Sequence, residues 1–402
     1  MENYYYAYKA KAKLELLINS YEVSTKVTVK LKNEPSFQKV LLLGKDETAL
    51  VNVAQKSELR GSERGYKTVL ITSDKDISVS TFNTKFLTAD AAVIYPTSSL
   101  GSEYYIFTPD LGVLGLRKEF AITNTEQPNT VTIKLTGAVL FQGHRYGKGS
   151  TVKVSLKPYE SAQFQSSDNL TGSRVVGTGP LAVLSGHTCS MTSFKCNHVY
   201  EQLPSVDQWG TDYLVAPTSV QNKCDYVYVL ASQPTELHVS CDRRPRQLQA
   251  GEAAKYRVYP NRPITIAAKK GILVLYYFPG VSKDGHKGYD PFLMTIRPTS
   301  QFASSYITRG LKDFTNFISI VAKSSETGKV LLDNHQLPGR NRWQAIGDSG
   351  YSWTDVSVGV RDERHVVQVT SGSGIAVYKY GVAEMNAYGC QGNEQTAGGP
   401  RP

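Results

Sequence analysis

The amino-acid sequence predicts an all-β protein built from tandem β-sandwich-like units of about 100 residues each. Its composition favours strands joined by tight turns, because the 402 residues include 25 Tyr, 33 Gly and 18 Pro but only 4 Met. Apolar and polar residues alternate with a period of two in many short segments, which is typical of half-buried strands. A third observation, an internal repeat, sets the size of the units.

The alternation is clearest in four segments, and clusters of Gly, Pro, Asn and Ser separate such segments along the chain. In the first segment, Val27, Val29 and Leu31 share one face of an extended chain. Helical periodicity is scarce, and its best examples are the short segments 10–17 and 197–203. The four alternating segments are residues 26–31, 131–135, 152–156 and 317–320.

Self-comparison finds one hairpin template four times: a strand, a polar turn, and a second strand with two inward-facing apolar residues. A second template places Tyr three residues after Gly in segments 101–106 and 210–215, and more loosely after Ala in 303–307. A third relates residues 156–164 to 248–256. The four hairpin copies are residues 71–79, 175–183, 266–274 and 369–377.

The repeat predicts four β units with boundaries near residues 103, 212 and 304. Each boundary falls at the strand that carries the second template. The sequence leaves open whether the units form a string or share sheets in one closed body. The predicted units are residues 1–103, 104–212, 213–304 and 305–388, followed by a disordered tail at 389–402.

Lysine and arginine outnumber the acidic residues, which gives a formal net charge of +10. The densest basic run contains Arg243, Arg244 and Arg246, and this balance favours acidic partners such as anionic glycans. Acidic and basic residues are mixed within the same segments, so the sequence predicts no nucleic-acid partner. No apolar run approaches about 18 residues, so it predicts no membrane span.

Two of the five cysteines, Cys189 and Cys196, are flanked by His187 and His198. Two thiolates and two imidazoles are a possible zinc ligand set. In an oxidising compartment the same two thiols would instead form a disulfide that closes a small loop. Free thiols are the third possibility, and we expect the disulfide.

The second pair, Cys224 and Cys241, flanks residues 226–239, which we interpret as a hairpin turning at 232–235. Cysteines opposite each other at the open end of a hairpin lie within reach of a disulfide, so we expect this pair to be bonded as well. Cys390 is left over, either as a free thiol in the tail or as a partner for another chain.

Around the first cysteine pair the chain contains the motifs Ser-Gly-x-x-Cys, Cys-x-His-x-x-Glu-Gln-Leu-Pro and Trp-Gly-x-x-Tyr. This signature resembles that of the N-terminal domain of the IgGFc-binding protein family, a module of large secreted, mucin-associated proteins. The chain departs from the family at both ends, and it begins without a secretory leader, which is consistent with a truncated fragment. The signature residues are Ser185, Gly186, His187, Cys189, Cys196, His198, Glu201, Gln202, Leu203, Pro204, Trp209, Gly210 and Tyr213.

The resemblance implies a secreted, non-catalytic interaction or adhesion module without a cofactor, whose partners are extracellular glycoproteins or mucins. It does not carry over antibody Fc binding, because no motif maps that activity onto residues of this chain. In a secreted protein, Asn169 of the Asn-Leu-Thr triplet would be a glycosylation site.

Two other functions stay open. A carbohydrate-active enzyme on a β scaffold would need two carboxylates about 5–10 Å apart. A purely structural spacer would show no distinctive surface patch. Candidate carboxylates for the enzyme are Glu160, Glu201, Asp207 and Asp212.

Overall fold

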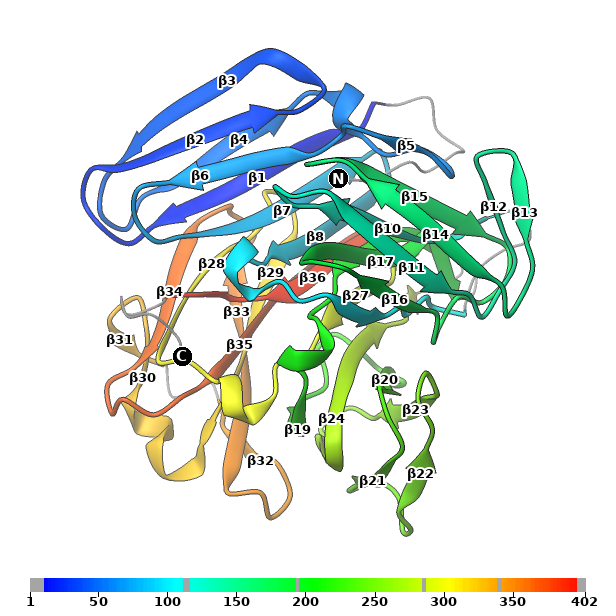
Figure 1. Ribbon diagram of the computed structural model, residues 1–402. Helices are drawn as coiled ribbons and strands as arrows, with labels where there is room; N and C mark the ends of the chain where they lie inside the picture. Colours follow the sequence, from blue (N-terminus) through cyan, green and yellow to red (C-terminus); the bar gives the residue numbers. More distant parts are fainter. Residues whose placement is uncertain (1–10, 111–115, 193–194, 284–286, 338–341, 396–402) are drawn as a thin grey trace. The chain divides into compact units, whose positions relative to one another are not determined.

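The computed structural model describes residues 11–110, 116–192, 195–283, 287–337 and 342–395. Its regular structure is almost entirely antiparallel β-strand, which confirms the predicted all-β class (Figure 1). Contacts divide the chain into two compact units. Unit 1 is Met1–Trp209 with Ala250–Ala253, and unit 2 is Gly210–Gln249 with Ala254–Pro402.

The first part of unit 1 is a sandwich of a four-stranded sheet, in the order β4-β1-β7-β8, and a three-stranded sheet, in the order β3-β2-β6. Leu16 and Ile18 of β1 pack with Val27 and Val29 of β2 in one buried cluster, because alternate residues of each strand face the partner sheet. The strands are β1 (Lys13–Ser20), β2 (Thr25–Leu31), β3 (Glu34–Leu43), β4 (Thr48–Val53), β6 (Val69–Ser73), β7 (Ile77–Lys85) and β8 (Thr88–Ile94).

The second part of unit 1 has a five-stranded sheet, β18-β17-β10-β15-β5, and a four-stranded sheet, β14-β11-β16-β9, while β12 and β13 form a separate two-stranded sheet. The ring of Phe164 stacks on both Phe120 and Phe141 in its core. The short strand β5 comes from the first part of the chain and pairs with β15, which ties the two parts together. The strands are β5 (Arg64–Gly65), β9 (Glu103–Tyr105), β10 (Lys118–Asn124), β11 (Asn129–Lys134), β12 (Val139–Phe141), β13 (His144–Tyr146), β14 (Thr151–Leu156), β15 (Ser161–Ser166), β16 (Arg174–Gly177), β17 (Leu181–Thr192) and β18 (Lys195–Gln202).

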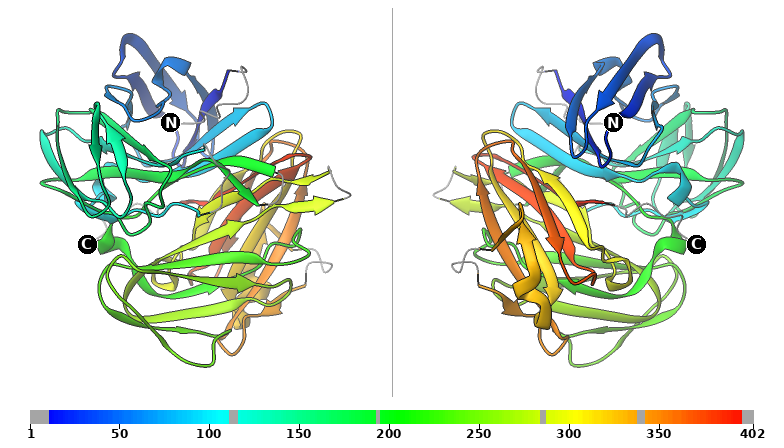
Figure 2. Two further views of the ribbon diagram at one scale, coloured as in Figure 1. Left: turned by 90° about the vertical axis from the view of Figure 1, so that its right-hand side faces the viewer. Right: turned by 90° about the vertical axis from the view of Figure 1, so that its left-hand side faces the viewer.

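Unit 2 begins with a seven-stranded sheet built around the 15-residue strand β24, and β25 and β26 pair with each other in a separate two-stranded sheet. Figure 2 shows these strands from two further sides. The strands are β19 (Gly210–Val215), β20 (Asp225–Ala231), β21 (Thr235–Val239), β22 (Arg246–Leu248), β23 (Ala253–Val258), β24 (Ile264–Phe278), β25 (Val281–Lys283), β26 (Lys287–Tyr289) and β27 (Phe292–Thr295).

The rest of unit 2 has two five-stranded sheets, β31-β30-β34-β28-β37 and β32-β33-β29-β35-β36. Their facing sides bury Ile318, Ile320, Val367 and Val377. The strands are β28 (Ser305–Arg309), β29 (Thr315–Lys323), β30 (Val330–Leu332), β31 (His335–Gln336), β32 (Gln344–Ala345), β33 (Tyr351–Gly359), β34 (Arg364–Val369), β35 (Ala376–Ala383), β36 (Asn386–Gln391) and β37 (Asn393–Glu394).

Helix is confined, among the described residues, to five short 3-10 segments, so none is long and apolar enough to cross a membrane. The two segments with the best helical pattern, 10–17 and 197–203, are not helical where they are described, since they lie largely in β1 and β18. The 3-10 segments are η1 (Gln55–Ser57), η2 (Thr97–Ser99), η3 (Val206–Gln208), η4 (Thr299–Gln301) and η5 (Ser324–Lys329).

The predicted tail is also wrong over its first residues. Residues 389–394 lie in β36 and β37, where β36 pairs with β35 and β37 pairs with β28. The final residues, 396–402, lie outside the described part of the chain.

A buried tyrosine fixes the first strand of three successive parts of the chain. In β9, the hydroxyl of Tyr104 accepts a hydrogen bond from the amide of Gly101, at 3.2 Å, and donates one to the carbonyl of Leu181, at 2.6 Å. We call this arrangement a tyrosine corner, since it resembles the corner found in Greek-key sandwiches. It ties the start of the segment to its hairpin template.

The same corner is present twice in unit 2. Tyr213 accepts from Gly210 at 3.1 Å and donates to Ile272 at 2.6 Å. Tyr306 accepts from Ala303 and donates to Ile375, both at 3.0 Å.

The three acceptor carbonyls, like the tyrosines, occupy equivalent places in the repeat found in the sequence. The corners also follow the 3-10 segments η2, η3 and η4. The count of four repeat units, and their boundaries, stay predictions.

Candidate functional site

The main concentration of buried charge in unit 1 lies around His198, a residue of the family-like segment. His198 on β18 is fully buried between two carboxylates, Asp90 on β8 and Glu119 on β10. Its Nδ1 lies 3.4 Å from Asp90 Oδ2, and its Nε2 lies 3.6 Å from Glu119 Oε1. We call these three residues the His198 cluster.

The two carboxylates decide the charge of the imidazole. Burial alone would lower the pKa of His198, but Asp90 and Glu119 together raise it to about 10. Burial raises the pKa of Asp90, and His198 offsets part of that rise. His198 is therefore an imidazolium at neutral pH, and its positive charge compensates carboxylates that burial would otherwise destabilise.

Asn197, the neighbour of His198, links β18 to β8. Its Oδ1 accepts hydrogen bonds from the Thr88 hydroxyl, at 2.6 Å, and the Ala89 amide, at 3.1 Å. Its Nδ2 donates to the Ala89 carbonyl at 2.8 Å. The buried amide thus replaces backbone pairing between two strands that belong to different sheets.

His187 differs from His198 in charge. Its Nδ1 accepts a hydrogen bond from the Cys189 amide at 2.9 Å. Burial, followed by the positive charges of Lys118 and His198, lowers the pKa of His187 to about 3. The ring is therefore neutral at physiological pH.

Cys189 and Cys196 form a disulfide, with a Cα–Cα distance of 5.1 Å, across the hairpin of β17 and β18. The predicted disulfide is confirmed, so the two sulfur atoms are bonded to each other and are not thiolates. Within the described residues, no group of three or more His, Cys, Asp or Glu side chains is arranged to hold a metal ion. Beside the disulfide the hairpin is tightly packed, because a Cβ at Gly186 would overlap the carbonyl oxygen of Val199.

The other signature residues connect β18 to the segment that follows β8 and stabilise the turn that follows β18. Gln202 Oε1 accepts from the Tyr95 amide at 3.2 Å, and the Trp209 indole donates to the Pro204 carbonyl at 3.1 Å. Glu201 and Leu203 are buried. The described contacts of this segment thus give its signature a structural role, and sequence reasoning missed the two carboxylates that it encloses.

The predicted disulfide between Cys224 and Cys241 is not formed, since both cysteines are free thiols. The hairpin interpretation behind it is wrong, because β20 and β21 both pair with β24 and follow one another along it. Tyr226 is opposite Tyr277, whereas Val239 is opposite Ile266, so the cysteines flank different ends of β24.

Cys390 is buried in β36, opposite Lys379 of β35. Burial lowers the pKa of Lys379, and the neighbouring thiol offsets part of that change. The predicted location of Cys390 in a disordered tail is therefore wrong.

Asn169, the predicted glycosylation site, is exposed in the loop between β15 and β16. Its Oδ1 accepts hydrogen bonds from the Thr108 hydroxyl, at 3.2 Å, and the Thr171 amide, at 2.9 Å. The loop presents this side chain to solvent, and glycosylation stays a prediction.

The four carboxylates considered for an enzyme lie in different surroundings: one is ion-paired, one is buried and two are exposed. Glu160 binds Arg64 with an Nε–Oε1 distance of 2.6 Å, and this partner lowers the pKa of Glu160. Glu201 is buried, while Asp207 on η3 and Asp212 on β19 are exposed.

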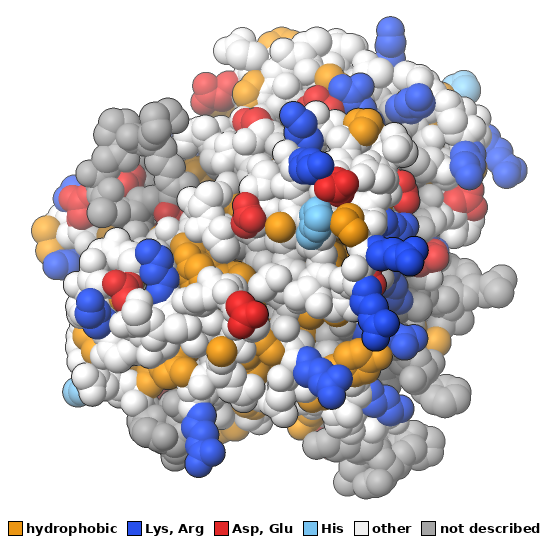
Figure 3. All heavy atoms as spheres, turned by 90° about the horizontal axis from the view of Figure 1, so that it is seen from below, with side chains coloured by type: hydrophobic (Ala, Val, Ile, Leu, Met, Phe, Trp, Pro, Cys, Tyr) orange, Lys and Arg blue, Asp and Glu red, His pale blue; other side chains and the backbone are white. Residues whose placement is uncertain are grey.

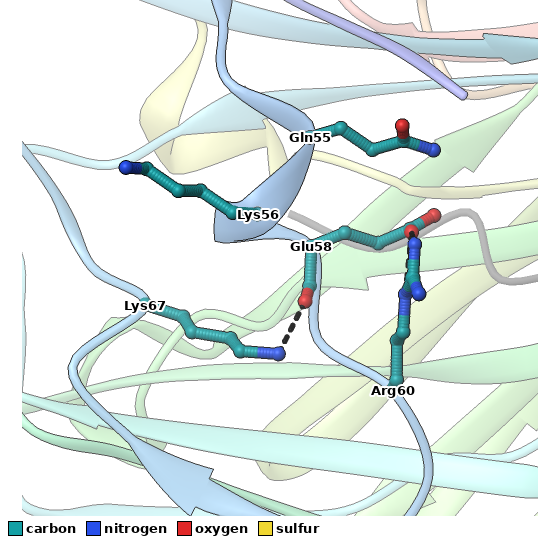
Figure 4. Close-up of a pocket in the computed structure, with 5 residues that line it drawn as sticks. All are labelled: Gln55, Lys56, Glu58, Arg60 and Lys67. Carbon is teal, nitrogen blue, oxygen red and sulfur yellow. Dashed lines mark hydrogen bonds and ion pairs between the residues drawn. The ribbon is translucent and has the colours of Figure 1, made fainter. Parts of the chain in front are cut away.

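A cavity of about 200 Å³ lies beside η1 in unit 1 (Figure 4). Its three cations already have acidic partners at 2.7–2.9 Å, which leaves little net charge to attract a ligand. The lining residues are Gln55, Lys56, Glu58, Arg60 and Lys67.

Comparison with known proteins agrees with the signature segment. The family model described as IgGFc binding protein matches residues 90–381. The human IgGFc-binding protein is 33% identical to the chain over 390 residues, which are 96% of this chain and 7% of the relative. The chain thus spans a small part of that relative's length. It belongs to the IgGFc-binding protein family.

Proposed function

We propose that the chain is an extracellular, non-catalytic binding module that attaches to glycoproteins of mucus or matrix. The observation that carries the proposal is family membership over most of the chain, together with the Cys189–Cys196 disulfide. Disulfides persist in oxidising compartments, so this bond supports an extracellular location. The exposed Asn169 is in keeping with it.

The surroundings of the His198 cluster support a binding function over catalysis. A general acid or base must come within hydrogen-bond reach of the substrate. His198, Asp90 and Glu119 are each at most 1% exposed, and they interact with one another. These groups stabilise the fold and are closed to a substrate. A glycosidase needs a pair of carboxylates. Glu160 does not support such a pair, because it is already ion-paired with Arg64.

The test is binding of the full chain, produced through a secretory pathway, to immobilised mucin glycoprotein in biolayer interferometry. We expect a dissociation constant in the micromolar range or below, and no binding to immobilised serum albumin. Binding to mucin that does not exceed binding to albumin would overturn the proposal. A parallel surface carrying IgG Fc tests the binding named in the human relative. Release of sugars from the mucin would favour the enzyme alternative.

A further inference from the structure

The outer face of two neighbouring strands in unit 2 combines aromatic rings with positive charge. β20 and β23 are adjacent in their sheet. The Nζ of Lys255 on β23 lies 3.8 Å from the ring centroid of Tyr226 and 5.4 Å from that of Tyr228, both on β20. Cation–π contact holds the ammonium group against these rings.

Arg257 and Tyr259 extend the same face. The guanidinium of Arg257 lies close to the phenol of Tyr259, and its titratable neighbours also include Tyr226 and Cys224. Lys255 and Arg257 are exposed because alternate residues of β23 point outward. Tyr259 is 44% exposed, which is unusual for a large aromatic ring. We call Tyr226, Lys255, Arg257 and Tyr259 the basic–aromatic patch.

The chain around the patch is strongly basic. Between Cys241 and Arg262 there are six basic and two acidic residues. Four of these arginines form no ion pair with a carboxylate anywhere in the described residues, in contrast to the cations of the cavity beside η1. Figure 3 shows several Lys and Arg side chains close together on the right-hand side of the surface that it draws. The four arginines are Arg243, Arg244, Arg257 and Arg262.

We propose that the basic–aromatic patch binds acidic sugar units, sulfated or carboxylated, on the glycans of glycoproteins. This inference rests on the proposed function and names the chemical class of its ligand. The planar guanidinium of Arg257 matches the two oxygens of a carboxylate or sulfate, and Lys255 adds a second positive charge. The exposed ring of Tyr259 offers an apolar face beside that charge for the sugar ring. The unpaired arginines around it raise the local concentration of polyanions.

The test compares immobilised heparin, polysialic acid and neutral dextran as probes for the full chain in biolayer interferometry at physiological ionic strength. We expect binding to at least one of the two acidic polymers and none to dextran. Arg257→Gln and Tyr259→Ala should each weaken that binding about tenfold, because each removes one contact of ordinary strength. Both side chains are exposed, so thermal unfolding curves should match those of the unchanged chain.

Arg361→Gln is the matched control. Arg361 is 80% exposed and lies in the same unit, in the turn after β33, paired with Glu363. The Arg361→Gln substitution removes the same positive charge as Arg257→Gln, and we expect it to change the affinity for the acidic polymer less than twofold. Equal losses in Arg361→Gln and Arg257→Gln would mean that net charge alone attracts the polymer, and would overturn the inference. Tighter binding of a single-stranded oligonucleotide than of either acidic polymer would overturn it as well.

A third arm separates the inference from the proposed function. Mucin is treated with sialidase and sulfatase before immobilisation. If the chain still binds the treated mucin with unchanged affinity, the binding module stands and the acidic-sugar inference fails. If the chain binds neither form of mucin, the proposed function fails. Loss of binding after treatment supports both.

Discussion

Both units of the chain bury carboxylates, but they compensate them in different ways. In unit 1, Asp90 and Glu119 flank the imidazolium of His198. In unit 2, Asp225 accepts hydrogen bonds from the Tyr276 hydroxyl and the Thr218 hydroxyl, and no cation is among its principal partners. A full opposite charge and a set of neutral donors are thus two solutions to the same desolvation problem.

A second pair in unit 2 follows the neutral pattern. Asp355 accepts from the Tyr380 hydroxyl and, at 3.0 Å, from the Ser219 amide. Neutral donors reduce the cost of burying a carboxylate without removing its charge. Burial accordingly raises the pKa of Asp225 to about 6 and also raises that of Asp355, with the hydrogen bonds offsetting part of each rise. Because the buried carboxylates are compensated differently, the stability of the two units should depend on pH over separate ranges.

The largest expected effect comes from His198→Gln. It leaves Asp90 and Glu119 buried without a cation, which should lower the free energy of unfolding of unit 1 by about 3–5 kcal/mol. Urea denaturation followed by the fluorescence of Trp209 reports on this unit, in a background where Trp343 and Trp353 are replaced by Phe.

The control for this substitution is His238→Gln in unit 2. His238 pairs with Glu236 at 3.1 Å, but its side chain is 55% exposed. An exposed pair contributes about 1 kcal/mol or less. Comparable losses in the free energy of unfolding for the two substitutions would contradict the contrast between the units, because His198 would then contribute no more than a surface residue.

The contribution of His198 to the stability of unit 1 should also depend on pH. Its pKa in the folded state, about 10, lies above its ordinary value of 6.5. Its contribution to stability is therefore complete below pH 6.5 and is lost as pH rises toward 10. Unit 1 should become less stable over this alkaline range, and His198→Gln should flatten the profile. A profile with the same slope in both proteins contradicts the role given to the imidazolium.

Removing the disulfide should have the next largest effect. Replacing Cys189 and Cys196 by Ser opens a link with a sequence separation of 7. Loop-closure entropy predicts a loss of about 2–3 kcal/mol. Hydrogen exchange measured by mass spectrometry should show the loss in unit 1 peptides and none in unit 2. A matched change at Cys224 and Cys241, which form no disulfide, should leave both units unchanged.

Acid should stabilise unit 2 through Asp225. Its folded pKa of about 6 exceeds the ordinary value of 3.8, so its contribution is complete below 3.8 and is lost as pH rises through 6. From pH 7 to pH 4 this group should add about 2 kcal/mol, measured by urea denaturation with Trp343 and Trp353 as reporters. Asp225→Asn should remove that part of the slope. An unchanged slope would show that Asp225 titrates normally.

The smallest effect concerns a feature that the two units share. Tyr104→Phe in unit 1 and Tyr213→Phe in unit 2 each remove the hydroxyl of a tyrosine corner. Each should cost about 1–2 kcal/mol, because two backbone groups lose their partner. The two costs should agree closely. A large difference would extend the contrast between the units beyond their buried carboxylates.

The sequence predicted the strands where one face is buried and the other is wet. Residues 26–31, chosen for their alternation, lie in β2 (Thr25–Leu31), whose buried and exposed residues alternate. In β1 and β18 nearly every described residue is buried, so the alternation disappears and residues 10–17 and 197–203 mimic a helix. Periodicity fails where both faces of a strand are covered.

The sequence predicted only those features of the candidate site whose residues lie close together along the chain. Cys189 and Cys196 are close in sequence, so their disulfide could be inferred from spacing and compartment. The partners of His198 come from strands far away along the chain, and one sequence carries no pairing information for them. The Cys224–Cys241 prediction failed because residues 232–234 interrupt two collinear strands, a break that resembles a hairpin turn in composition alone.

The tyrosine corners also dictate the order in which the chain can fold as it leaves the ribosome. Each hydroxyl binds a carbonyl far ahead of it, with separations of 77, 59 and 69 residues for Tyr104, Tyr213 and Tyr306. A corner cannot close until that carbonyl has been synthesised. The nascent chain should therefore form its tyrosine corners one after another, from the N-terminus onward.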